Sequence, residues 1–104
     1  MKGERMEPSD RAAHDAQSVA TFVQTAPRLL RLPPPIMELL GITLTSVGDG
    51  QAVMEMDATE RHTNPMGTLH GGVLCDIADA AMGIAYYSTL AEGESFTTLE
   101  LKIK

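Results

Sequence analysis

Residues 71–90 decide the fold, and they read GGVLCDIADAAMGIAYYSTL, an almost uninterrupted apolar run. Asp76 and Asp79 are its only charged residues. The length approaches the ~20 residues of a membrane span. Two carboxylates in the first half, together with Gly72 and Gly83, argue against a lipid environment. The run therefore predicts a long helix that is buried on most sides by protein.

The segments around this run predict β structure. Residues 42–47 are rich in β-branched types, residues 48–50 form a Gly-Asp-Gly turn, and residues 52–58 alternate, with Ala and Met on one face. This pattern is typical of an antiparallel hairpin with one buried face. Residues 95–104 alternate again and predict a third strand. A short helix is expected just before the hairpin, from Pro35 to a left-handed stop at Gly41.

An N-terminal extension precedes this α+β unit. A helix is expected over about residues 11–25, with Ser9 or Asp10 as its cap. Three prolines at 33–35 then rule out a continuous helix or a central strand. The predicted organisation is a helical extension with a Pro-rich linker over residues 1–35 and a single domain over residues 36–104.

Three strands are too few to cover a helix that is apolar on all sides. We therefore expect either that the domain over residues 36–104 lacks its C-terminal strands or that another chain supplies the missing surface.

Composition limits the classes of function. The chain has 104 residues, which fits one domain, and a formal net charge of −6. Such an acidic chain is a poor partner for nucleic acid or an anionic membrane. Cys75 is the single cysteine and cannot form an internal disulfide, and the first eight residues do not resemble a signal peptide. We expect a soluble, cytoplasmic protein whose seven methionines pack in a core or line an apolar pocket.

Residues 62–72, HTNPMGTLHGG, lead directly into the long helix and are the candidate site. A helix that begins at Gly71 and Gly72 presents unpaired N–H groups at the positive end of its dipole, where they can stabilise an oxyanion. Asp79 is a candidate general base or nucleophile, but it lies about 12 Å farther along the helix axis. If both act on one carbonyl, the carboxylate must come from a second subunit in a two-fold dimer.

The pattern of these residues resembles that of the hotdog-fold acyl-CoA thioesterases of the phenylacetate-degradation type, over roughly residues 36–104. The matching positions are Asn64, Gly67, His70, Gly71, Gly72 and Asp79. The resemblance implies a hotdog fold, in which an antiparallel sheet wraps a long central helix. It also implies a homodimer or homotetramer that hydrolyses acyl-CoA to free acid and coenzyme A, with no metal or redox cofactor.

The same resemblance assigns roles to individual residues. Asp79 is the catalytic carboxylate, which activates water or attacks the thioester, and the Gly71 N–H binds the thioester oxygen. The other implied catalytic residues are Asn64 near that oxygen, His70 beside it, and Thr98, with Thr97 as its rival, to orient the water. The implied substrate-binding residues are His62, Gly67 and Gly72.

Several alternatives stay open from the sequence. The domain could be a hotdog module that binds acyl-CoA without turnover, or an inactive fragment of a thioesterase. His70 could equally serve only to position the loop, and Asp76 is interpreted as a carboxylate favoured by the helix N-terminus. The spacing of His62 and His70 matches no compact metal-binding pair, so no metal site is expected. Cys75 is interpreted as a small buried hydrophobe.

Overall fold

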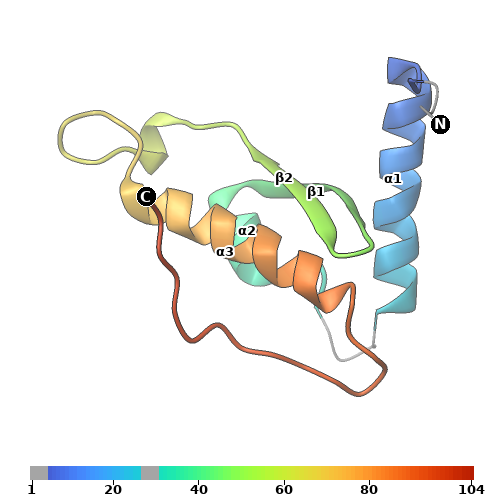
Figure 1. The fold of residues 1–104 in the computed structure, drawn as a ribbon. Helices are drawn as coiled ribbons and strands as arrows, with labels where there is room; N and C mark the ends of the chain where they lie inside the picture. The colour runs from blue at the N-terminus through green and yellow to red at the C-terminus, as the bar shows by residue number, and fades with distance from the viewer. Residues whose placement is uncertain (1–4, 27–30) are drawn as a thin grey trace.

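The computed structural model describes residues 5–26 and 31–104. Within them the chain forms an α+β structure in which a long helix packs against a small antiparallel sheet (Figure 1). The elements in chain order are α1 (Pro8–Thr25), α2 (Pro35–Leu40), β1 (Ile42–Gly48), β2 (Gln51–Met56), the 3-10 helix η1 (Glu60–His62) and α3 (Gly71–Tyr87). The predicted α+β class and the predicted hairpin, short helix and long helix are confirmed.

The hairpin follows from its turn. Asp49 and Gly50 form a two-residue loop, and both have positive φ, at 51° and 79°. Asp-Gly favours such a turn, whose twist matches that of the two strands. The turn sets the register, in which Ile42 pairs with Met56 and Val47 pairs with Ala52.

A β-bulge at Thr45 keeps the inner face of the hairpin apolar. The register of β1 shifts between Leu44 and Ser46. Strict alternation after Leu44 would turn Ser46 inward, whereas the extra residue brings Val47 to the inner face instead. Val47 is buried and Ser46 is paired with exposed Val53.

The small core lies where α2, the hairpin and the start of α3 meet. Its buried apolar residues within the described chain are Met37, Ile42, Val47 and Val73. Helix α2 starts at Pro35 and ends at Gly41, whose φ of 75° is left-handed, as expected. The sharp stop at Gly41 directs the chain into β1, so that Met37 packs beneath the sheet.

Helix α3 is less covered than expected. Val73 is its one buried residue in the structure described, and Leu74, Met82 and Tyr86 are exposed. The prediction of burial on most sides is therefore wrong for one chain. The reason is that a two-stranded sheet covers only one side of the helix.

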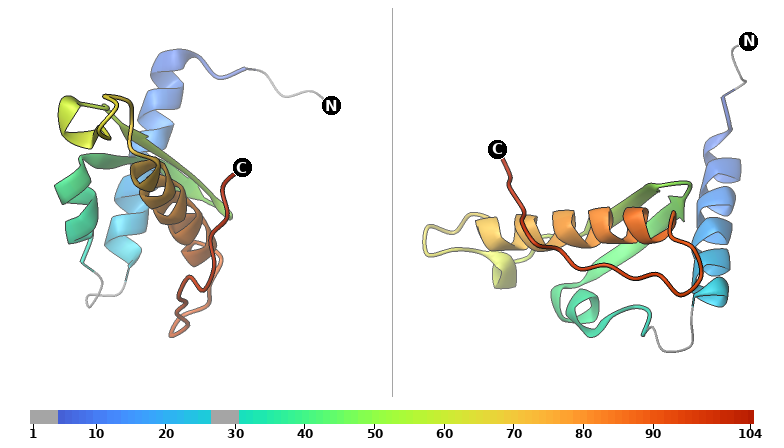
Figure 2. Two further views of the ribbon diagram at one scale, coloured as in Figure 1. Left: turned by 90° about the vertical axis from the view of Figure 1, so that its left-hand side faces the viewer. Right: turned by 60° about the horizontal axis from the view of Figure 1, so that its bottom comes forward.

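The predicted third strand is also wrong. Residues 91–104 have no strand or bridge, and they run back along α3 as an extended segment that ends near the start of α3 (Figures 1 and 2). Alternation predicted a strand, but a strand forms only when its backbone pairs with a neighbour. Here the segment passes beside α3 rather than along an edge of the hairpin.

Helix α1 begins earlier than predicted, at Pro8 instead of Arg11, and neither Ser9 nor Asp10 caps it. Glu7 is the N-cap residue and makes no side-chain cap bond, since Pro8 at the first turn already fixes the helical φ. In the expected extension over residues 1–35, residues 1–4 and 27–30 lie outside the described residues.

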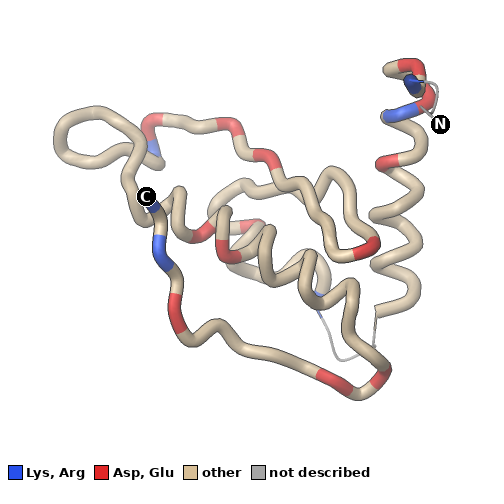
Figure 3. The backbone as a smooth tube through the Cα atoms, in the orientation of Figure 1, with Lys and Arg blue, Asp and Glu red and all other residues tan. Residues whose placement is uncertain are grey.

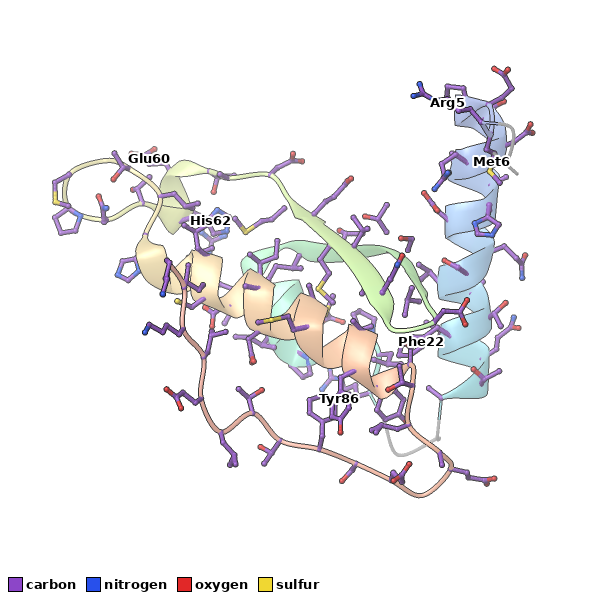
Figure 4. The ribbon with its side chains drawn as sticks, viewed as in Figure 1. Arg5, Met6, Phe22, Glu60, His62 and Tyr86 are labelled. Carbon is purple, nitrogen blue, oxygen red and sulfur yellow. The ribbon has the colours of Figure 1, made fainter. Side chains whose placement is uncertain are left out.

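Contacts hold α1 against the outer edge of β1. The Ser18 hydroxyl accepts a hydrogen bond from the Val47 N–H at 3.2 Å. The Phe22 and Tyr87 rings make a T-shaped contact with 5.9 Å between their centroids, so α1 also contacts the end of α3 (Figure 4). Helix α1 thereby covers a sheet edge that would otherwise leave polar backbone groups unpaired.

Charges are dispersed over the described residues. Lys and Arg do not gather on one face, and acidic residues follow the hairpin, α3 and the loop after it (Figure 3). No helix among the described residues has the length and apolar character that a membrane crossing requires.

We predict that Met37→Ala lowers the free energy of unfolding by about 2–4 kcal/mol, because truncating a buried methionine leaves a cavity. Leu39→Ala is the matched control in the same helix and should cost below about 0.5 kcal/mol. Met37 is 3% exposed and Leu39 is 72% exposed. Urea unfolding measures both, and equal losses would contradict this description of the core.

Candidate active site

Asp79 lies at the middle of α3, and Thr98 is its hydrogen-bond partner. The Thr98 hydroxyl donates to Asp79 Oδ1 at 2.7 Å. This bond joins α3 to the segment that follows it, across 19 positions of sequence. Thr97 makes no such bond among the described residues, so the structure brings Thr98 and not its rival to the carboxylate.

A cleft of about 270 Å³ opens beside this pair. Apolar side chains from α2 and α3 form much of its wall, including Met37, Ala80 and Ile84. The half-buried Asp79 and the exposed Asp76 both border it. A carboxylate at an apolar cleft is the kind of group that can take a proton from bound water.

The start of α3 is capped in a way that the sequence does not suggest. His70 is the N-cap residue, and its Nδ1 accepts the Gly72 N–H at 2.9 Å. An added Cβ on Gly72 would lie only 3.0 Å from this ring, so the glycine allows the ring to fold over the helix end. The Gly72 N–H is therefore already bonded within the chain, and the expected substrate-binding role of Gly72 stays a prediction.

Gly71 keeps a free donor. Its N–H has no hydrogen-bond partner among the described residues, and the residue is exposed at the first position of α3. Unpaired amides at a helix start attract negative charge. A Cβ added to Gly71 would meet nothing within 4 Å, so a ligand can approach this amide closely.

Asn64 organises the loop before the helix. Its Oδ1 accepts from the N–H groups of Met66 and Thr68, and its Nδ2 donates to the Thr68 hydroxyl. A side-chain amide has two N–H groups, so one donor of Asn64 stays available for a ligand. Gly67 has a φ of 80°, which glycine adopts without strain, and the structure gives it a turn role in this loop.

His62 is held on both sides of its ring. Its Nδ1 accepts the Thr59 N–H at 3.0 Å, and its Nε2 lies 2.9 Å from the Leu40 carbonyl oxygen, to which it donates. These bonds tie the loop to the end of α2. Neither ring nitrogen of His62 is free, so the ring holds the loop in place, and the expected substrate-binding role of His62 stays a prediction.

The two chemically important points are far apart in one chain. Gly71 and Asp79 are separated by eight residues of continuous α3, which is about 12 Å along the axis. A thioester carbonyl bound at the Gly71 N–H is thus out of reach of Asp79 in the same chain. His70 lies at the first point, where its N–H donates to the His62 carbonyl oxygen, and Thr98 lies at the second.

Exposed apolar side chains continue beyond Asp79 on α3. Met82 and Tyr86 follow at one and two turns, and they are 53% and 55% exposed. Tyr86 meets the edge of the Phe96 ring, with centroids 5.4 Å apart (Figure 4). Gly83 makes room for Phe96, because a Cβ there would lie 3.1 Å from the ring. A glycine inside an apolar helix was the sequence signal for this close contact.

The described residues contain no group of three or more His, Cys, Asp or Glu side chains arranged to hold a metal ion. Cys75 has a free thiol and is half-buried in α3.

The family comparison matches residues 25–103 to a family described as "Domain of unknown function (DUF4442)". The match leaves out almost all of α1.

Two curated relatives are thioester hydrolases by name. The chain is 35% identical over 66 residues to a 1,4-dihydroxy-2-naphthoyl-CoA hydrolase of Listeria monocytogenes, covering 64% of this chain and 54% of that protein. It is 42% identical over 48 residues to the human acyl-coenzyme A thioesterase 13, covering 46% of this chain and 34% of that protein. The chain thus spans about half or less of the relatives that it matches.

One solved structure also matches, that of the conserved protein PA5202 from Pseudomonas aeruginosa. The TM-score is 0.54 and the identity 32%, over 60% of this chain and 50% of the other. PA5202 has the hotdog fold. The chain is therefore a distant homologue of hotdog-fold thioesterases.

We predict that His70→Ala lowers the free energy of unfolding by about 0.5–2 kcal/mol, because the N-cap acceptor is lost. His70→Asn should restore most of the loss, since asparagine is among the best N-cap residues. Chemical denaturation measures both variants. Equal destabilisation by Ala and Asn would show that capping is not what His70 contributes.

Proposed function

We propose that this chain, which belongs to the family described as "Domain of unknown function (DUF4442)", carries an acyl-CoA thioesterase site in which Asp79 is the catalytic carboxylate. The Asp79–Thr98 hydrogen bond at the apolar cleft is the observation that carries the proposal. The named activities of two relatives support the same class of reaction. On the Asn64 to Asp79 motif, we assign the site to the phenylacetate-degradation type.

Thr98 has a defined part in this proposal. By donating to Oδ1, its hydroxyl engages one carboxylate oxygen and fixes the plane in which the other oxygen can act. It also leaves the hydroxyl oxygen as an acceptor for water. Thr98 thus positions Asp79 and a water molecule relative to each other, as a base needs for proton transfer.

The reaction then proceeds through a tetrahedral intermediate. Water adds to the thioester carbonyl while Asp79 takes its proton, and the negative charge develops on the carbonyl oxygen. The Gly71 N–H and the remaining Asn64 donor bind this oxygen. The C–S bond breaks, the coenzyme A sulfur takes the proton from Asp79, and the free acid leaves. Direct attack by Asp79 would break the C–S bond, release the coenzyme A thiolate and give an anhydride, which water then hydrolyses to the free acid and the Asp79 carboxylate.

Two protomers are required for this chemistry. Because Gly71 and Asp79 lie about 12 Å apart on one helix, we propose that α3 of a second copy packs antiparallel and lends its Asp79. The exposed Met82 and Tyr86 support such a contact, since a partner would cover them. The result is a homodimer, alone or within a tetramer, with two equivalent sites.

Asp79→Asn in the full-length protein should lower kcat for hydrolysis of acyl-CoA esters at least about a hundredfold, because the amide cannot accept the proton. Asp76→Asn is the matched control one turn earlier on α3, and it should stay within about threefold of the parent. Release of free thiol measures both variants. Unchanged turnover by Asp79→Asn would remove this carboxylate from the mechanism.

Gly71→Pro tests the oxyanion donor and the dimer together. Proline removes the N–H yet suits the first helical position, and the extended His70 backbone tolerates a following proline. We expect a loss of about a hundredfold or more in kcat. Gly71→Ala, the control, keeps the N–H and should lose far less.

Mixed dimers of Gly71→Pro and Asp79→Asn chains should recover about a quarter of the parental activity. Random exchange makes half of the dimers mixed, and each mixed dimer has one intact site. Refolding the two inactive variants together, against each alone, measures the recovery. No recovery in verified mixed dimers would place both residues of a site in the same chain.

A further inference from the structure

We propose that α1 forms the end wall of the pocket for the substrate's acyl group and so limits its length. This inference rests on the proposed thioesterase function and adds a substrate class to it, acyl groups of up to about ten carbons. It concerns a helix that lies almost wholly outside the family match.

An apolar cavity of about 250 Å³ lies between α1, the segment after it, the hairpin and α3. Every lining side chain except Thr43 is apolar, and none is charged. Helix α1 contributes Val19, Phe22 and Val23 to its wall. A cavity of this chemistry excludes the phosphates of coenzyme A and favours a hydrocarbon.

The cavity adjoins the cleft beside Asp79. The two spaces share Pro34, Met37, Ile42 and Ile84 as lining residues. Ile84 is five residues beyond Asp79, or about 7.5 Å along α3. A thioester whose carbonyl is near Asp79 can therefore place its acyl group past Met37 and Ile84 and into the cavity. This continuity identifies the occupant as the acyl group.

The volume sets the length of the acyl group. An apolar protein cavity of about 150 Å³ accommodates benzene, with its six carbons. By proportion, a cavity of about 250 Å³ holds roughly ten carbons. Met54 and Met37 line it, and flexible methionines adapt to chains or single rings of this size.

Contacts with β1 and α3 hold α1 in a fixed position, so it can form a wall of the cavity. Ser18, one residue before Val19, bonds to β1, and Phe22, three residues after Val19, contacts Tyr87. These two contacts fix the face of α1 that points into the cavity. Substitutions that shorten the side chains on that face, or that enlarge them so that they fill the cavity, should thus change the preference for acyl-chain length. They should leave the chemistry at Asp79 unchanged.

Val19→Trp in the full-length protein tests the wall. It should lower kcat/KM for decanoyl-CoA at least about tenfold and change that for acetyl-CoA less than about twofold. The control is Ala20→Trp, the exposed neighbour that lines neither space. Equal effects of the two variants, or an equal loss for every acyl length, would overturn the proposal while leaving thioester hydrolysis intact.

Binding gives a second readout that does not depend on turnover. Calorimetry of Asp79→Asn with acetyl- to tetradecanoyl-CoA should show affinity rising about fourfold per methylene, with a plateau near ten carbons. Val19→Trp, added to that variant, should move the plateau to shorter chains. No dependence on length, or no plateau, would contradict the cavity even if Val19→Trp fails to fold. Absence of all turnover with this binding pattern would reject the proposed hydrolysis but support the acyl pocket.

Discussion

The structure depends on one constraint, which is that α3 is apolar on nearly all sides and a single hairpin covers only one of them. The side of α3 that faces the sheet packs into the small core, which consists of Met37, Ile42, Val47 and Val73. The opposite side keeps large apolar groups in contact with water, at a cost of roughly 25 cal/mol per Å². The segment after α3 contributes Phe96 but no paired strand. Leu74, Met82 and Tyr86 therefore stay exposed on this side.

The same helix also fixes the geometry of the site. Its first amide offers a donor at Gly71, its middle offers an acid at Asp79, and the helical rise holds them about 12 Å apart. A rigid spacing of this size cannot be closed by a side-chain movement. The proposed second copy on the exposed side of α3 would answer both needs, because it would bury apolar surface and bring an acid to a donor. Packing and chemistry thus favour the same assembly.

Local signals predicted the parts of the fold that local forces determine. The Asp-Gly turn, the stop at Gly41 and the apolar run of α3 all act over a few residues, and each is found as expected. The bulge at Thr45 could not be predicted, since it arises from the need to bury Val47 instead of Ser46. The strand expected over residues 95–104 required a neighbour that alternation alone does not guarantee. The alternation of a sequence shows which face of a strand would be apolar, whereas the pairing of that strand with a neighbour depends on the rest of the molecule.

Some features of the candidate site could likewise be predicted from the sequence, whereas others are seen only in the structure. The motif predicted Asp79 as the catalytic carboxylate, and the structure places Thr98 rather than Thr97 beside it, because the turn after α3 sets which hydroxyl reaches Oδ1. Sequence could not show that His70 takes the Gly72 amide or that both nitrogens of His62 are occupied, as histidine is an unusual cap. These bonds leave the Gly71 amide as the free donor among the described residues at the helix start. In the proposed site, this amide and the remaining Asn64 donor would together bind the carbonyl oxygen.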